Sequence, residues 1–132
     1  MTRQSAVVEL LKIRCPSLQA VYAFGSRIQG NAGPESDLDL AVLVAGYADP
    51  HLLWQLAGDL ADLAGCPVDL LDFRAASTVM QARILTTGER WWAADSKIDA
   101  YEAAVLNDKL ALDAARASLI NDIQREGHVY GR

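Results

Sequence analysis

The sequence predicts a single domain of the α/β (α+β) class, in which helices flank a mixed sheet and a helical tail comes last. Two observations carry this prediction. Short apolar runs typical of buried strands alternate with stretches whose apolar residues recur every three or four positions, as in amphipathic helices. The composition of the chain then changes: residues 96–125 are rich in alanine, leucine and charged residues and contain neither proline nor glycine, which is typical of helix.

The first half of the chain is expected to contain a helix, a strand, a single helical turn, a second strand and a second helix. Their predicted ranges are 5–13, 19–24, 27–32, 38–44 and 50–64. The turn is short because Gly33 and Pro34 interrupt it. Pro50 suits the first turn of the second helix, and Gly65 suits its end.

The second half is expected to add a strand, a helix, an edge strand, and then one long helix or two shorter ones. The predicted ranges are 68–73, 77–85, 90–93 and 96 to about 125. Residues 1–95 therefore form the predicted core, and residues 96–132 form a helical extension of the same domain. The last six residues, 127–132, are expected to fray.

The helical extension carries two apolar rows, and the two rows lie on different faces. One row consists of Ile98, Tyr101, Val105, Leu112 and Leu119, and the other of Leu106, Leu110 and Ile120. Packing on the domain itself is one interpretation of the first row. Because a helix that is apolar on more than one side needs more than one partner surface, one of the two rows is expected to bind another protein chain.

Composition and charge exclude several classes of function. With 132 residues, 52% of them hydrophobic and 22% charged, the chain is predicted to fold rather than to be disordered. It has no membrane-length apolar run and no signal-peptide pattern, which predicts a cytoplasmic protein without membrane contact. The net charge of −5 disfavours direct binding of nucleic acid. A small substrate or a basic protein partner fits this charge better.

The Gly25-Ser26 pair stands where the predicted strand 19–24 meets the helical turn. Glycine lets a phosphate approach the backbone closely because it has no Cβ. Free N–H groups at a helix start bind anions, and the serine hydroxyl adds a donor. A Gly-Ser pair alone is also typical of an ordinary turn. The assignment of a phosphate site therefore depends on the charged residues that follow after ten further positions.

Asp37 and Asp39 stand at the start of the predicted strand 38–44. Their side chains point to the same face, about 6.6 Å apart along the backbone. A solvated strand edge or a turn is the alternative for an Asp-x-Asp taken alone. The strand is nearly all apolar, however, and an uncompensated pair of charges at its mouth would be costly. A divalent cation that also binds phosphate oxygens would compensate the two negative charges. Magnesium is the expected cation, and manganese could take its place.

A third carboxylate is expected from the strand 68–73, which offers Asp69 and Asp72. The two side chains face opposite sides of the strand, so only one of them can join the site. The periodicity of the sequence does not show which one, because both faces of the strand are otherwise apolar. The reaction expected from such a site is attack of a hydroxyl on the α-phosphate of a nucleoside triphosphate, with release of pyrophosphate. The third aspartate would orient or deprotonate the hydroxyl.

Three segments, Phe24-Gly25-Ser26, Asp37-Leu38-Asp39 and Val68-Asp69-Leu70, resemble the minimal nucleotidyltransferase (MNT) branch of the DNA polymerase β-like superfamily. The resemblance covers residues 1 to about 93 and implies a polymerase β-like fold. The roles that it implies are nucleotide binding for Gly25, Ser26 and Arg27, and catalysis and metal binding for Asp37, Asp39 and Asp69. Asp72 becomes the alternative third carboxylate, and a solvated side chain is the alternative for Arg27.

The brevity of the chain and its segment 69–77 further resemble the antitoxins of type VII-like HEPN/MNT toxin–antitoxin systems. That resemblance implies Mg²⁺-dependent transfer of AMP from ATP to a tyrosine of a HEPN ribonuclease toxin, the expected partner, which is thereby neutralised. Two alternatives are a small-molecule nucleotidyltransferase of the aminoglycoside type and an antitoxin that binds without catalysis. The tail's His128 and Tyr130 echo part of the HEPN nuclease signature, which we interpret as coincidence.

The three tryptophans, Trp54, Trp91 and Trp92, could stack on a nucleotide base. Tryptophan in helix and edge-strand positions more often packs in the core or at its margin. We therefore expect packing roles for all three.

Overall fold

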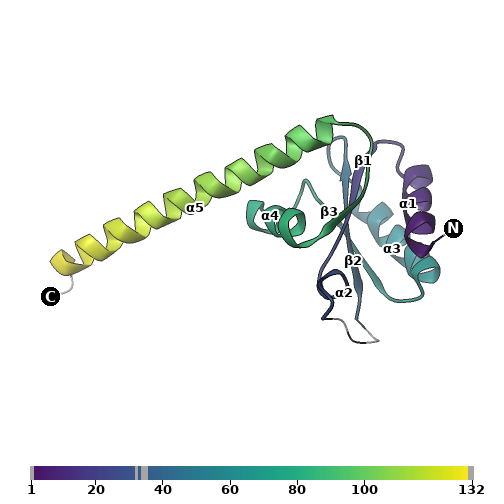
Figure 1. Ribbon diagram of the computed structural model, residues 1–132, viewed down its shortest axis with the longest axis horizontal. Coiled ribbons are helices and arrows are strands. Elements are labelled where there is room, and N and C mark those ends of the chain that lie inside the picture. The colour runs from purple at the N-terminus through teal and green to yellow at the C-terminus, as the bar shows by residue number, and fades with distance from the viewer. Residues whose placement is uncertain (1, 32, 34–35, 131–132) are drawn as a thin grey trace.

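The computed structural model describes residues 2–31, 33 and 36–130 and shows a mixed four-stranded sheet (Figure 1). The strands are β1 (Leu18–Phe24), β2 (Leu38–Val44), β3 (Val68–Asp72) and β4 (Glu89–Ala93). Their order across the sheet is β3-β2-β1-β4. β1 pairs antiparallel with β2 and β4, whereas β2 and β3 are parallel. The predicted class, a mixed sheet flanked by helices, is confirmed.

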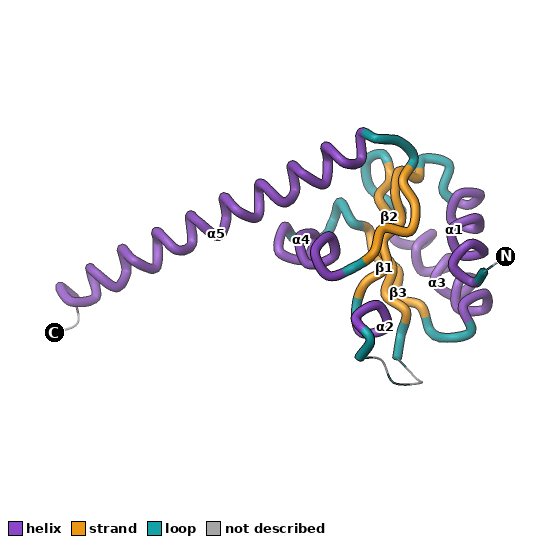
Figure 2. The backbone as a smooth tube through the Cα atoms, viewed as in Figure 1, coloured by secondary structure: helices purple, strands orange, loops and turns teal. Residues whose placement is uncertain are grey.

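Helices cover both faces of this sheet (Figures 1 and 2). α1 (Arg3–Arg14) and α3 (Pro50–Ala64) lie on one face, and α4 (Thr78–Thr87) and the start of α5 (Lys97–Tyr130) lie on the other. Alternate residues of β2 enter the two cores. Leu40 and Val42 join the α1/α3 side, and Ala41 and Leu43 join the α4/α5 side. We call these the α3 face and the α5 face of the sheet.

Side-chain caps and glycines determine where the helices begin and end. Asp49 caps α3 by accepting a hydrogen bond from the His51 N–H group, and Gly65 ends this helix at a φ of 73°. These bounds agree with the sequence prediction. The short α2 (Ser26–Gln29) ends earlier than predicted, because Gly30 adopts a left-handed conformation with a φ of 83°. Residue 32, the predicted end of this turn, lies outside the described residues.

α5 is one continuous helix of 34 residues, which decides between the one-helix and two-helix predictions. The structure continues the helix to Tyr130, into the segment 127–132 for which fraying stays a prediction. A single glycine at 127 costs a helix only about 1 kcal/mol, and no proline stops it. The last two residues, 131–132, and the side chains of residues 126–130 lie outside the description.

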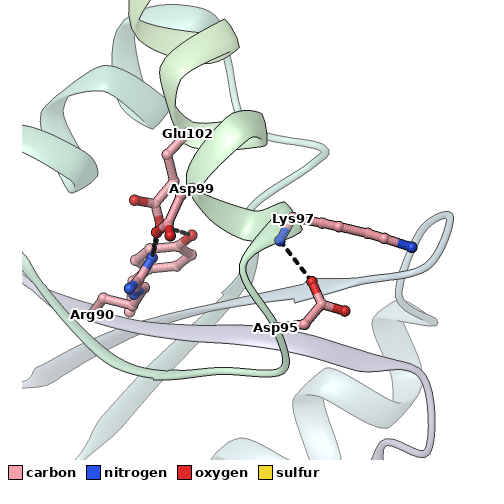
Figure 3. A network of polar contacts seen from close by, with 6 residues as sticks. Arg90, Asp95, Lys97, Asp99 and Glu102 are labelled. Carbon is pink, nitrogen blue, oxygen red and sulfur yellow. Dashed lines mark hydrogen bonds and ion pairs between the residues drawn. The ribbon is translucent and has the colours of Figure 1, made fainter.

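A polar network ties the start of α5 to the sheet (Figure 3). Arg90 of β4 donates to Asp99 at 2.7 Å and to Glu102 at 3.2 Å. The Tyr22 hydroxyl of β1 donates to Glu102 at 2.6 Å. Burial, together with the adjacent Glu102 carboxylate, raises the pKa of Tyr22, so its hydroxyl stays protonated. Ile98 is buried on the same stretch of helix.

The remainder of α5 extends away from the domain (Figure 1). The first apolar row packs as predicted only over its first half, where Ile98 and Val105 are buried. Further along the same row, Leu119 is 59% exposed. In the second row Leu110 and Ile120 are 67% and 54% exposed. Both rows therefore leave the end of α5 with uncovered apolar side chains.

Among the described residues, no helix combines the length and the apolar character needed to cross a membrane.

Candidate active site

Gly25, at the end of β1, has a backbone conformation that only glycine adopts readily. Its φ is 85° and its ψ is −165°. A Cβ built at this position would lie 2.1 Å from the Oδ2 atom of Asp39. The Gly25 carbonyl accepts hydrogen bonds from the Ile28 and Gln29 N–H groups, which start the helical turn at Ser26. The glycine thus brings the Asp39 carboxylate directly against the main chain that leads into this turn.

Strand register places the predicted carboxylates side by side. Asp39 is opposite Phe24 in the antiparallel pair and opposite Asp69 in the parallel pair. Adjacent strands lie about 4.8 Å apart. The end of β1, Asp39 and Asp69 therefore form one row across the end of the sheet. Asp37 directly precedes β2.

The two carboxylates on the strands of this row point to the α5 face. Asp39 alternates with the α3-face residues Leu38 and Leu40, and Asp69 alternates with Val68 and Leu70, also on the α3 face. Asp37 and Asp69 are exposed, whereas Asp39 is half-buried. The structure therefore brings together the residues that the sequence singled out.

Burial and mutual repulsion both disfavour the charged form of Asp39. Burial raises the pKa of the Asp39 carboxyl above its ordinary value, and the nearby charges of Asp69 and Asp37 raise it further. Within the part of the chain that the structure describes, no positive charge is among the causes of this shift. A bound cation would relieve this repulsion.

The donor set fits a hard divalent cation. Within residues 2–31, 33 and 36–130, no three His, Cys, Asp or Glu side chains already enclose a metal position. Magnesium does not require such a cage, because it is usually held by one or two carboxylates together with substrate phosphates. Asp37 and Asp39 supply such oxygen ligands, and Asp69 stands opposite Asp39. Because Gly25 has no Cβ, the Asp39 carboxylate can lie directly against the main chain at the end of β1.

Asp72, the alternative third carboxylate, has a different role. It is buried, and its Oδ2 atom accepts the Ala48 N–H group at 2.9 Å. Its Oδ1 atom accepts the Arg74 N–H group at 3.0 Å. Both carboxylate oxygens therefore hold the backbone at the far end of β3, on the face opposite to Asp69. Of the two candidates, Asp69 is the one that stands opposite Asp39, and its role as the third carboxylate stays a prediction.

Arg27 supports the loop that leads to the carboxylates. Its Nε atom donates to the Ser36 carbonyl at 2.7 Å, directly before Asp37. The sequence predicted a phosphate contact for Arg27 but not this hydrogen bond, because no local pattern links Arg27 to Ser36. Binding of nucleotide by Arg27 stays a prediction, and the bond places its guanidinium beside the site.

The tryptophans divide into two groups. Trp91 and Trp92 are half-buried and pack against the α3-face core, as expected. The prediction of a packing role is wrong for Trp54, whose side chain is 77% exposed on α3. The buried stripe of α3 consists of Leu53, Leu56, Leu60 and Ala64, and Trp54 lies beside this stripe. Trp54 borders a groove that also includes Asp69.

Comparison with known proteins identifies the family. Residues 7–97 match the family described as Polymerase beta, Nucleotidyltransferase. The chain belongs to this family of nucleotidyltransferases. The match spans every strand of the sheet and all three carboxylates.

Three similar proteins extend the comparison beyond the core. Protein adenylyltransferase MntA of Shewanella oneidensis is 34% identical over 120 residues, which cover 91% of this chain and 86% of MntA. A crystal structure of a toxin–antitoxin with AMP-PNP contains a chain that is 33% identical, with a TM-score of 0.80, and covers 93% and 99% of the two chains. A structure of tri-AMPylated Shewanella oneidensis HEPN toxin in complex with MNT antitoxin matches with 31% identity, a TM-score of 0.74 and coverage of 92% and 96%.

Proposed function

We propose that this nucleotidyltransferase is an antitoxin that transfers AMP from ATP to a tyrosine hydroxyl of a HEPN ribonuclease toxin and thereby neutralises it. The observation that carries the proposal is the row of Gly25, Asp39 and Asp69 across the end of the sheet, with Asp37 beside it. Similarity to a protein adenylyltransferase over 91% of the chain supports the protein acceptor. The cytoplasm, where ATP is available, stays the predicted location.

Each residue of the site would have a distinct task. Gly25 and Ser26 would bind the triphosphate through backbone N–H groups and the serine hydroxyl. Asp37 and Asp39 would hold Mg²⁺, which when bound neutralises phosphate charge and orients the α-phosphate. Asp69 would accept the proton of the tyrosine hydroxyl or orient this hydroxyl toward phosphorus. The oxygen–phosphorus bond to tyrosine forms as the bond to pyrophosphate breaks.

The proposal is tested by incubating the chain with labelled ATP, Mg²⁺ and a purified, unmodified HEPN partner. We expect label on the partner, and tyrosine as the modified residue in peptide mass spectrometry. Label on a small aminoglycoside but not on the partner would support the small-molecule alternative. Tight partner binding without label would support an antitoxin that acts by binding alone.

Asp69 and Asp72 are expected to respond in opposite ways to truncation. Asp69→Ala should lower the transfer rate at least about a hundredfold, the typical loss of a general base, with stability nearly unchanged because the side chain is exposed. Asp72→Ala should lower the free energy of unfolding by about 1–3 kcal/mol, because it leaves the N–H groups of Ala48 and Arg74 without their acceptor. Denaturant unfolding and single-turnover transfer measure the two effects. Equal activity losses in two equally stable variants would contradict the assignment.

The helical extension predicted at residues 96–132 is proposed as the main surface for the partner. The projecting part of α5 exposes Leu119, Ile120 and Ile123 by 59%, 54% and 58% of their surface, although such side chains favour burial. A helix that leaves the domain cannot bury both of its apolar rows by itself, and a second protein chain would cover them.

The double variant Ile120→Ala and Ile123→Ala is expected to weaken partner binding at least tenfold, or about 1.4 kcal/mol. Alanine removes apolar area and retains helix propensity, so the thermal stability of the isolated chain should not fall. Gln124→Ala is the matched control, since it truncates an exposed polar residue of the same helical turn. Calorimetric titration with the HEPN partner measures the affinities. Equal affinities for the double variant and the control would exclude this surface.

A further inference from the structure

An open groove of about 660 Å³ runs between α3 and the outer strand β3. Trp54, Gly58 and Ala61 line it from the helix, and Val68, Asp69 and Leu70 line it from the strand. The helical residues recur at spacings of four and three, so they share one exposed side of α3. From Pro50 to Ala61 this side of the helix advances about 16 Å, which matches about five residues of extended chain.

β3 is an edge strand, and this decides what kind of ligand the groove fits. Its inner side pairs with β2, and within the described sheet no strand pairs with its outer side. A free strand edge presents N–H and C=O groups to which an extended peptide can add as a new strand. The adjacent groove provides apolar space for side chains of such a peptide, with the exposed Trp54 ring beside it.

The order of strands relates this edge to the reaction. The triphosphate-binding pair Gly25-Ser26 comes directly after β1, Asp39 is on β2, and Asp69 is on β3. In phosphoryl transfer the attacking and leaving oxygens lie roughly in line. With the triphosphate bound at Gly25-Ser26 as proposed, pyrophosphate would leave toward β1, and the attacking hydroxyl would arrive from the opposite direction, across β3. The free edge of β3 lies on that side.

Strand periodicity connects the groove to the carboxylates, although the two are on different faces. Asp69 points to the α5 face, whereas the groove lies on the α3 face. In an added strand successive side chains alternate between faces. A residue on the α5 face would therefore present its hydroxyl beside Asp69, while its neighbours at the preceding and following positions would enter the groove.

We propose that the edge of β3 and the α3 groove bind an extended segment of the acceptor protein, which adds as a fifth strand and places its acceptor hydroxyl beside Asp69. This inference rests on the proposed function and identifies how the acceptor is held. The residues flanking the acceptor are apolar or aromatic, because Trp54, Ala57 and Leu53 line the groove.

Gly58→Leu tests this proposal by filling the groove. A Cβ at Gly58 would have no atom of the described residues within 4 Å, and its φ is not in the left-handed region, so a side chain enters without strain. Leucine also favours a helix interior over glycine, and the melting temperature should stay equal or rise. Gly58→Ala is the matched control at the same position, because its single methyl group leaves most of the groove open.

The measurements use the full chain, Mg²⁺ and the purified, unmodified HEPN partner. We expect Gly58→Leu to lower the single-turnover transfer rate at saturating partner at least about tenfold and Gly58→Ala less than about threefold. Affinity for AMP-PNP, titrated without the partner, should change less than about threefold in both. In hydrogen exchange with AMP-PNP present, addition of the partner should protect the β3 amides.

Three results would overturn the proposal. An unchanged transfer rate in Gly58→Leu would show that the acceptor does not use the groove, although the wild-type reaction and hence the proposed function would stand. A tenfold loss of AMP-PNP affinity would assign the groove to the nucleotide instead. No transfer of AMP to the partner by the wild-type chain would overturn the proposed function and this inference together.

Discussion

Asp39→Asn is expected to lower the rate of AMP transfer about a thousandfold or more while the fold stays intact. Asp39 is central in the row, since it lies against Gly25 on one side and opposite Asp69 on the other. A metal ligand contributes several kcal/mol of charge stabilisation in the transition state, and each 1.36 kcal/mol corresponds to a factor of about ten in rate. The neutral asparagine amide would provide far weaker stabilisation of a divalent cation.

The stability of the metal-free Asp39→Asn variant should equal or exceed that of the wild type at pH 7. Burial and the neighbouring carboxylates raise the pKa of Asp39 above its ordinary value of 3.8, so the folded state binds this proton more tightly than the unfolded state. The contribution of Asp39 to stability is therefore most favourable at low pH and is lost as pH rises through the raised pKa. Above that pH the ionised carboxylate opposes folding, and asparagine removes this effect.

Thermal unfolding in the presence of a chelator, at pH 7 and at pH 4, measures the stability effect. The gain from Asp39→Asn should be larger at pH 7 than at pH 4. Asp62→Asn is the control, because Asp62 is an exposed aspartate of α3 that does not line the groove or the carboxylate row. A stable Asp39→Asn variant that still transfers AMP at the wild-type rate would exclude Asp39 as a metal ligand.

The core of the site was predictable because its information is local. Gly25, Asp37 and Asp39 lie at the ends of two segments whose apolar residues predict strands. A glycine or a charged residue next to such an apolar segment is easily recognised in the sequence. The same reasoning could not choose between Asp69 and Asp72. Both faces of their strand are apolar, and the choice depends on the backbone N–H groups from which Asp72 accepts hydrogen bonds, one of them at the distant Ala48.

Tertiary placement explains what the sequence did not predict. The pattern of α3 predicts an amphipathic helix. It does not predict that Trp54 lies beside β3, because the position of Trp54 depends on which strand the helix packs against. The bond from Arg27 to the Ser36 carbonyl depends on the path of the intervening loop. For α5 the apolar rows predicted contacts, but not the residue at which the helix leaves the domain.

Gly25→Ala is expected to impair both stability and activity, through two separate effects. The conformation at φ 85° and ψ −165° is essentially restricted to glycine, so alanine should cost about 1–3 kcal/mol of unfolding free energy. In addition, the new methyl group would lie 2.1 Å from the Asp39 Oδ2 atom, so that carboxylate must move away. A displacement of about 1 Å in a catalytic group can cost about a hundredfold in rate.

Gly30→Ala separates these two effects. Gly30 has a similar φ of 83°, but a Cβ there has no atom of the described residues within 4 Å, so the variant adds backbone strain without displacing Asp39. We expect both variants to unfold at lower denaturant concentration and only Gly25→Ala to lose transfer by about a hundredfold at a temperature where each is fully folded. Equal activity in the two would show that the contact with Asp39 is unimportant. A selective loss would show that Gly25 serves catalysis by leaving room for the Asp39 carboxylate, beyond its tolerance of an unusual backbone conformation.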